Sequence, residues 1–192
     1  MIIDWIQSLD ETITLFINSF HCKPGDHIWQ LFSLKETWFP LYALVLYYLI
    51  RRLGWKKGLV LALSLALTVL ACDQLSNVLK EAVGRLRPCY NADMLSSGLH
   101  VLESRSGFYG FYSAHSANAF GFAIASTSAF KTDKAHNYDK YEWFVYVWAA
   151  MIGLSRIFAG KHFFGDVLVG MIVGLVIGWC LARIARMVTD RI

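Results

Sequence analysis

The chain has 192 residues, of which 56% are hydrophobic, 15% aromatic and 17% charged, and its mean hydropathy is +0.44. It is too apolar for a soluble domain of this length and too short for two large domains, so we expect one membrane-embedded domain over residues 1–192. The net charge of +4 is modest, and the basic residues are spread between apolar segments. Nucleic acid is therefore not expected as a partner.

The first 22 residues predict an amphipathic helix. Apolar side chains recur at steps of three and four residues from Ile2 to Phe20, with polar side chains such as Asp4, Glu11 and Asn18 between them. The acidic residues and the lack of a basic start argue against a cleavable signal peptide. We expect this helix to lie in the membrane interface more readily than to span the bilayer.

Five apolar segments follow, each long enough or nearly long enough to cross a bilayer, which needs about 20 helical residues. They are residues 30–50, 58–79, 113–130, 143–160 and 163–184. The predicted fold is therefore all-α, an integral-membrane bundle of about five transmembrane helices within residues 25–190, preceded by the amphipathic helix.

The basic residues between these segments predict an orientation. Three clusters would lie on one side of the membrane if every segment spans it: Arg51, Arg52, Lys56 and Lys57; Lys131, Lys134 and Lys140; Arg183, Arg186 and Arg191. The positive-inside rule makes that side cytoplasmic. We expect a bacterial inner-membrane protein whose opposite side, with residues 81–112 and 155–166, faces the periplasm or exterior.

The ionisable residues on that outer side gather near helix ends. The basic ones are Lys80, Arg85, Arg87, Arg105, Arg156 and Lys161. A charge in or beside a membrane segment costs about 2.5–3.5 kcal/mol even on lenient scales, so several at one depth require a partner. The simplest partner is an anion bound at the membrane surface.

The last segment begins with a histidine and an aspartate on a stripe of small residues. Every fourth residue belongs to this stripe: His162, Asp166, Gly170, Gly174, Gly178 and Ala182. Glycines at this spacing let helices approach closely, so the stripe should face the bundle interior. Asp166 can accept the ring N–H of His162 and leave the other nitrogen free as a nucleophile or base. The alternative is a buried pair that only satisfies its own polar groups.

A second histidine, His115 in YSAHSAN, opens the third segment beside Ser113 and the free N–H groups of the first helical turn. Alone, it would be read as an interfacial or hydrogen-bonded core residue. Two histidines, an aspartate, a serine and several cations on one rim instead favour catalysis.

These residues resemble a known three-part signature. KEAVGRLRP carries Lys80 and Arg87, YSAH carries Ser113 and His115, and SRIFAGKHFFGD carries Arg156, His162 and Asp166. Their order and spacing are similar to those of the type-2 phosphatidic acid phosphatase superfamily, the lipid phosphate phosphatases that share their site with vanadium haloperoxidases and glucose-6-phosphatase.

The resemblance implies a metal-independent phosphatase without a cofactor. His162 would attack phosphorus to form a phosphohistidine, Asp166 would orient it, and His115 would protonate the leaving oxygen and later activate water. The phosphoryl oxygens would be bound by Lys80, Arg87, Ser113, the Ala114 N–H and Arg156.

The second motif departs from the family pattern Pro-Ser-Gly-His at Tyr112 and Ala114. Alanine keeps the backbone N–H, so the anion site survives if this residue has a negative φ. If the site needs the positive φ of glycine, the loop must strain at a cost on the order of 1 kcal/mol.

Several further residues have two interpretations. Asp73 could hold Asn77 or reach toward Lys80, or it could belong to a polar pair that locks helix packing. Arg85 and Arg105 could bind the second phosphate of a diphosphate, or could be solvated loop charges. Lys161 falls outside the matched spacing. Cys22 and Cys89 could pair in an oxidising compartment.

The substrate class follows from the location of the site. A phosphate site at the outer rim of an apolar bundle suits a lipid head group, and Tyr90, Phe108, Tyr109, Phe111 and Tyr112 could line its entrance. Undecaprenyl diphosphate is the leading expectation for a small outward-facing bacterial enzyme. Phosphatidylglycerol phosphate, phosphatidic acid and lipid A phosphates stay open, as does the oligomeric state. The rival classes are a transporter, which would carry midplane charges and an internal repeat, and an inactive scaffold.

Overall fold

The computed structural model describes residues 2–103 and 107–192, and this part of the chain consists of helices joined by turns and loops, without a β-strand. Its elements are α1 (Ile2–Asn18), α2 (Lys23–Ser33), η1 (Lys35–Trp38), α3 (Phe39–Leu53), α4 (Trp55–Val83), η2 (Pro88–Tyr90), α5 (Ala92–Ser96), α6 (Ala114–Phe130), α7 (Asp139–Phe158) and α8 (Phe164–Thr189). The expected all-α class is confirmed.

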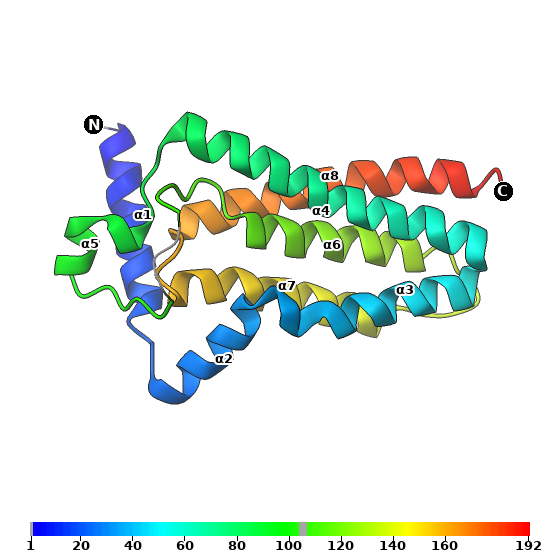
Figure 1. Cartoon of the computed structure of the whole chain (residues 1–192), viewed down its shortest axis with the longest axis horizontal. Coiled ribbons are helices and arrows are strands. Elements are labelled where there is room, and N and C mark those ends of the chain that lie inside the picture. Colours follow the sequence, from blue (N-terminus) through cyan, green and yellow to red (C-terminus); the bar gives the residue numbers. More distant parts are fainter. Residues whose placement is uncertain (1, 104–106) are drawn as a thin grey trace.

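Five helices form an elongated bundle. α3, α4, α6, α7 and α8 run along the long axis, while α1, α2 and α5 gather at one end (Figure 1). α4 and α8 are long and apolar enough to cross a membrane. The shorter α3, α6 and α7, with 15, 17 and 20 residues, are about 22, 26 and 30 Å long, so the count of five spans stays a prediction.

The first predicted segment, residues 30–50, is not one helix. α2 ends at Ser33, Leu34 is extended, and α3 begins only after the turn of η1. Pro40 lies in the first turn of α3, where proline favours a helix start and disfavours helix in the residue before it. The predicted segment therefore breaks into α2, which packs on α7, and the shorter α3.

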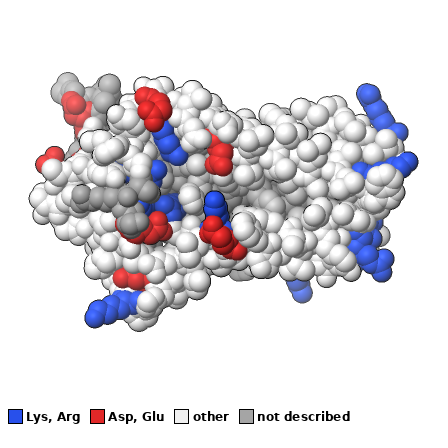
Figure 2. Space-filling model, in the orientation of Figure 1, with Lys and Arg blue, Asp and Glu red and all other residues white. Residues whose placement is uncertain are grey.

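Charges separate along the bundle axis. Figure 2 shows lysines and arginines at the end where α8 terminates, acidic and basic residues together at the opposite end, and a largely uncharged band between them. Arg51 and Arg52 end α3, Lys131 follows α6 and Arg186 ends α8, so the three basic clusters share that end (Figure 1). An uncharged band between two charged ends is typical of a membrane protein.

The glycine stripe of α8 brings it against α6. Gly170, Gly174, Gly178 and Ala182 are all buried, as the step of four residues predicts. A Cβ on Gly174 would lie 2.1 Å from the Ala117 backbone oxygen, and one on Gly170 would lie 2.5 Å from the Ser113 oxygen. This contact places the start of α6, with His115, beside the start of α8.

Candidate active site

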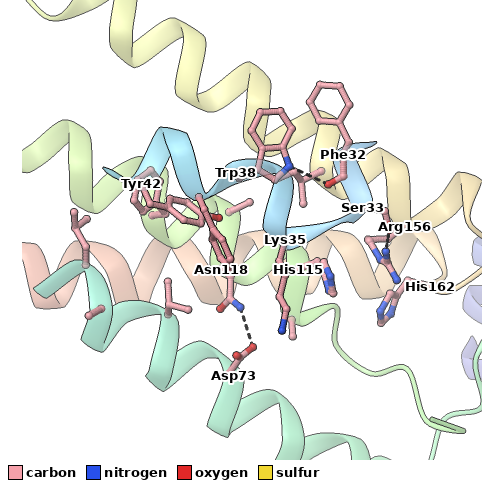
Figure 3. A pocket seen from close by; sticks show the side chains of 18 of the residues that line it. Phe32, Ser33, Lys35, Trp38, Tyr42, Asp73, His115, Asn118, Arg156 and His162 are labelled. Atoms are coloured by element: carbon pink, nitrogen blue, oxygen red, sulfur yellow. Dashed lines mark hydrogen bonds between the residues drawn. The ribbon is translucent and has the colours of Figure 1, made fainter. Parts of the chain in front are cut away.

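One cleft collects most of the predicted site residues. A cavity of about 800 Å³ is lined by Lys80, Arg87, Ala114, His115, Arg156 and His162, which are six of the eight. Figure 3 shows His115, His162 and Arg156 at one end of this cleft and Tyr42 at the other. Ser113 and Asp166 do not line it: both are fully buried behind its wall.

His162 lies in the turn between α7 and α8 with Asp166 behind it. Its Nδ1 is 3.6 Å from Asp166 Oδ2, so the two groups are in contact but not at hydrogen-bond length. The ring is 2% exposed, and this burial lowers the pKa of His162 to about 4, although Asp166 opposes the shift. His162 is therefore a neutral imidazole near pH 7, with Nδ1 toward the carboxylate.

Arg85 fixes the carboxylate of Asp166. Its Nη1 donates to Asp166 Oδ1 at 2.8 Å and its Nη2 to Asp10 Oδ2 at 2.7 Å, while the guanidinium lies 4.0 Å from the centre of the Phe163 ring. Neither interpretation of Arg85, a ligand of a second phosphate or a solvated loop charge, is supported, because two carboxylates already bind it. Arg85 instead positions Asp166.

The N-terminal helix supplies polar groups that hold the catalytic turn. Asp10 Oδ1 accepts the Gly165 N–H at 2.7 Å, and Thr14 Oγ1 accepts the Phe164 N–H at 2.9 Å, so α1 caps the start of α8. Asn18 Nδ2 donates at 3.0 Å to the carbonyl of Ile157 near the end of α7. α1 thus binds both helices that flank His162.

The orientation of α1 explains this arrangement. Asp10, Thr14 and Asn18 follow at steps of four and point into the molecule, whereas Trp5 and Phe16 are 65% and 63% exposed. The sequence predicted that α1 is amphipathic. It did not predict that its polar stripe, Asp10, Thr14 and Asn18, would be turned inward and would hold α7 and α8. The repeat of Asp, Thr and Asn at every fourth position was the available signal.

The YSAH motif forms the start of α6, and Ala114 has a negative φ there. Ser113 caps the helix, and its Oγ accepts the Ser116 N–H at 3.4 Å. Ala114 is the first helical residue, and no described residue other than glycine has a positive φ. Alanine therefore fits where the family pattern has glycine.

Tyr112 replaces the proline of the family pattern and anchors the same turn. Its side chain is fully buried, its hydroxyl donates to the Cys72 carbonyl at 2.9 Å, and its own carbonyl accepts from Ser76 Oγ at 3.1 Å. The expectation that Tyr112 lines the entrance is wrong, because this side chain fills the space between α4 and α6. Phe108, in contrast, is 63% exposed.

Backbone pairing and a tight packing contact position Arg87. Its N–H donates to the Phe108 carbonyl at 2.9 Å, and its Nε donates to the Tyr109 carbonyl at 3.1 Å. Gly110 is buried beside it, and a Cβ there would lie 3.2 Å from Arg87 Cγ and 3.2 Å from Asp166 Oδ2. Gly110 is a site residue that the sequence analysis missed.

Arg156, at the end of α7, is held by two groups that the sequence did not indicate. Its Nη1 donates to Ser33 Oγ and lies 3.2 Å from Glu103 Oε1, and its Nη2 lies 3.4 Å from Glu103 Oε2. Its Nε is buried and has no hydrogen-bond partner among the described residues. This N–H is a buried donor in a residue that lines the cleft.

The structure also places two further lysines and the two cysteines that could have formed a disulfide. Lys161 is only 1% exposed, and burial lowers its pKa, so it is not a solvated loop charge. The side chain of Lys35 extends into the cleft, between the pair Asp73 and Asn118 and His115 (Figure 3). Cys22 is exposed and Cys89 buried, and both are free. Arg105 lies outside the described residues.

The described residues contain no group of three or more His, Cys, Asp or Glu side chains that could hold a metal ion. Around the cleft they provide a neutral histidine backed by a carboxylate, a second histidine, and four cations, which are Lys35, Lys80, Arg87 and Arg156. This combination suits binding of a phosphoryl group and attack on it.

Comparison with known proteins agrees with this chemistry. The PAP2 superfamily model matches residues 57–190. Lipid A 4'-phosphatase of Bacteroides thetaiotaomicron is 32% identical over 99% of this chain and 83% of its own length, and that of Porphyromonas gingivalis is 30% identical over 91% and 72%. A transmembrane PAP2 type phosphatidylglycerolphosphate phosphatase from Bacillus subtilis has a similar fold, with a TM-score of 0.74, 23% identity, and coverage of 95% of this chain and 87% of that one.

A family match over more than half of the chain, with relatives at 30% identity over most of their length, places this chain in the PAP2 superfamily. It is a membrane phosphatase. The resemblance inferred from the three sequence motifs is confirmed.

Proposed function

We propose that this protein hydrolyses a phosphate monoester on a lipid A-type glycolipid. The observation that carries the proposal is the cleft itself, which joins His115, His162 and Arg156 to apolar walls from α3 and α4. A phosphorylated lipid can place its phosphate at one end of such a cleft and its chains along the other. The two lipid A 4'-phosphatases that resemble this chain support the glycolipid.

The reaction would proceed through His162. Because Nδ1 lies toward Asp166, the free Nε2 attacks phosphorus; the P–N bond forms as the P–O bond to the lipid breaks. His115 gives its proton to the departing lipid oxygen. In the second step His115 takes a proton from water, the water oxygen attacks phosphorus, and His162 leaves as inorganic phosphate forms.

The cations would bind the phosphoryl oxygens during both steps. Lys80 and Arg87 line the cleft, and the unpartnered Nε of Arg156 supplies a buried donor. The Ala114 N–H lies at the start of α6, where the helix dipole also favours an anion. Ser113 would act indirectly, since its hydroxyl already caps that helix.

Two candidate substrates differ in their number of phosphates. The lipid A relatives favour a glycolipid monophosphate, whereas undecaprenyl diphosphate was the first expectation from location alone. Arg85 is bound to Asp10 and Asp166 and so does not serve a second phosphate, whereas Lys35 is a fourth cation in the cleft. The preference for the monophosphate therefore rests on the lipid A relatives. The cleft end of the bundle is opposite the basic clusters, which supports an active site on the periplasmic or outer face.

A phosphate-release panel tests the proposal. Purified protein in detergent is supplied with lipid A, undecaprenyl diphosphate, phosphatidylglycerol phosphate and phosphatidic acid at equal mole fraction. We expect the highest kcat/KM with lipid A. Release from undecaprenyl diphosphate alone would refute the substrate, and release from none of them, with the fold intact, would favour an inactive scaffold.

Two variants test the roles. His162→Ala should abolish turnover and any trapped phosphoenzyme; a phosphoenzyme in this variant would exclude His162 as the nucleophile. His115→Ala should slow alkyl phosphates far more than aryl phosphates, because only a poor leaving group needs the proton. An equal loss on both would contradict its role as an acid.

A further inference from the structure

The cleft continues past the phosphate site to a polar pair that the proposed chemistry does not use. Asp73 on α4 and Asn118 on α6 both line the cleft, and Asn118 Nδ2 donates to Asp73 Oδ1 at 2.8 Å (Figure 3). Asp73 lies seven residues before Lys80, which is about 10 Å along α4, and Asn118 lies three residues after His115, which is about 5 Å along α6. The pair is therefore deeper in the cleft than the phosphoryl group.

The chemistry of the pair excludes phosphate as its ligand. A carboxylate repels an anion, so Asp73 is not itself a phosphate ligand, although its negative charge favours the charged form of Lys80. The Asp73 carboxylate also fixes the amide of Asn118, because only the NH₂ side can face it as a donor. The Asn118 Oδ1 is then left over, and it is buried without a partner among the described residues.

The hydrogen-bonding capacity that remains belongs to acceptors. Among the described residues Asn118 Oδ1 has no donor, and Asp73 accepts the bond from Asn118 although its two oxygens offer about four acceptor positions. A buried acceptor without a partner destabilises the structure that holds it, and this penalty disappears when a ligand donates a hydrogen bond to it. The matching ligand group is a hydroxyl or an amide N–H.

The walls around the pair indicate where that group lies on the ligand. Leu65, Ala66 and Val69 of α4 and Tyr42 and Leu46 of α3 line the same cleft, so the pair is set in an apolar channel that continues away from the phosphate end. A hydroxyl or amide N–H at this depth lies about 5–10 Å from phosphorus. On a phosphorylated lipid, this distance corresponds to the sugar or to the first atoms of the acyl chains.

We propose that Asp73 and Asn118 form a specificity site that accepts hydrogen bonds from a hydroxyl or amide N–H next to the phosphorylated end of the lipid. This inference rests on the proposed function as a lipid phosphatase and narrows its substrates to lipids that carry such donors. Lipids with only ester-linked chains leave both acceptors unpaired and are poorer substrates.

Two lipids with the same phosphate monoester and matched chains test the inference. Ceramide 1-phosphate carries a hydroxyl and an amide N–H near the phosphate, and phosphatidic acid carries neither. We expect the wild-type kcat/KM to favour ceramide 1-phosphate by about 10-fold or more, as for one or two hydrogen bonds to charged or buried acceptors. Phenyl phosphate, which does not reach the pair, reports on the catalytic groups alone.

The matched variants replace both partners together. Asp73→Leu with Asn118→Leu removes the acceptors and keeps an apolar contact between α4 and α6, so the preference should fall about 10-fold while phosphatidic acid and phenyl phosphate change less than about 3-fold. The exchange Asp73→Asn with Asn118→Asp keeps a carboxylate–amide pair and should keep the preference. Thermal unfolding in detergent checks both folds, and the single change Asn118→Leu replaces the double leucine variant if that variant is unfolded.

An equal loss on both lipids would show that the pair only packs α4 against α6, and an unchanged preference would show that it does not contact the substrate. Equal wild-type kcat/KM for both lipids would refute the proposed specificity site but not the proposed phosphatase activity. A wild-type protein that cleaves phenyl phosphate but no lipid overturns both.

Discussion

Because α6 and α8 pack closely, we expect Gly174→Ala to reduce activity strongly. The added Cβ would lie 2.1 Å from the Ala117 backbone oxygen, about 1.3 Å short of the 3.4 Å at which ordinary contact begins. The obstacle is a backbone atom, so no side-chain rotation relieves it and α6 must move by about 1 Å. Ala117 is two residues from His115, so the histidine moves with it.

The expected magnitudes follow from this displacement. Overpacking costs about 1–3 kcal/mol, and the better helix propensity of alanine returns only about 1 kcal/mol, so the unfolding temperature in detergent should fall by a few degrees. A displacement of about 1 Å at a catalytic group costs about 100-fold in rate. Activity should therefore fall much more than stability.

The assay is phosphate release with kcat and KM measured separately, together with thermal unfolding of the same sample. Val176→Ala is the matched control, since Val176 is on the same helix and 56% exposed; it should leave both measurements close to wild type. Wild-type kcat in Gly174→Ala, with the fold retained, would refute the close approach of α6 and α8 as the feature that positions His115.

Three further predictions concern the surroundings of His162. Asp10→Ala removes the acceptor for Arg85 and for the Gly165 N–H, so the free energy of unfolding should fall by about 2 kcal/mol. The kcat should fall by at least 10-fold with little change in KM, and Asp10→Glu should recover part of the kcat. An effect on KM alone would argue against a positioning role. Gly110→Ala places a Cβ 3.2 Å from Asp166 Oδ2 and should lower kcat, with normal kinetics as the contradicting result. Burial lowers the pKa of His162 to about 4. Between pH 6.5 and pH 4 the unfolded chain therefore binds a proton at this residue that the folded chain does not bind. The free energy of unfolding present above pH 6.5 should decline as the pH falls through this window. His162→Gln should flatten that decline in the unfolding temperature, and an identical pH profile in both proteins would contradict it.

The sequence was informative where the chemistry depends on spacing. The step of four residues from His162 through Gly178 predicted which face of α8 is buried, and the three motifs predicted six side chains that line one cleft. Both follow from periodicity and covalent spacing, which the sequence states directly. The segment boundaries were less accurate, since a hydropathy pattern does not show that Pro40 starts a new helix after Leu34.

The sequence was uninformative where a residue acts through distant contacts. Arg85 and Glu103 looked like loop charges or were passed over, because their partners Asp10, Asp166 and Arg156 lie at least 53 residues away along the chain. Tyr112 was assigned to the entrance because aromatic residues favour the interface, yet its hydroxyl reaches the Cys72 carbonyl in the core. Pairings across the bundle depend on how the helices pack, and no local pattern encodes them.

The polar stripe of α1, formed by Asp10, Thr14 and Asn18, extends the functional enzyme beyond the family-matched region. The family-matched region starts at residue 57 and contains all three motifs, yet Asp10, Thr14 and Asn18 lie outside it and hold the turn that carries His162. A chain shortened to the matched region would keep every motif residue and lose the groups that order them. The functional boundary of the enzyme is therefore set by hydrogen bonds from its first helix, well before the boundary that motif similarity defines.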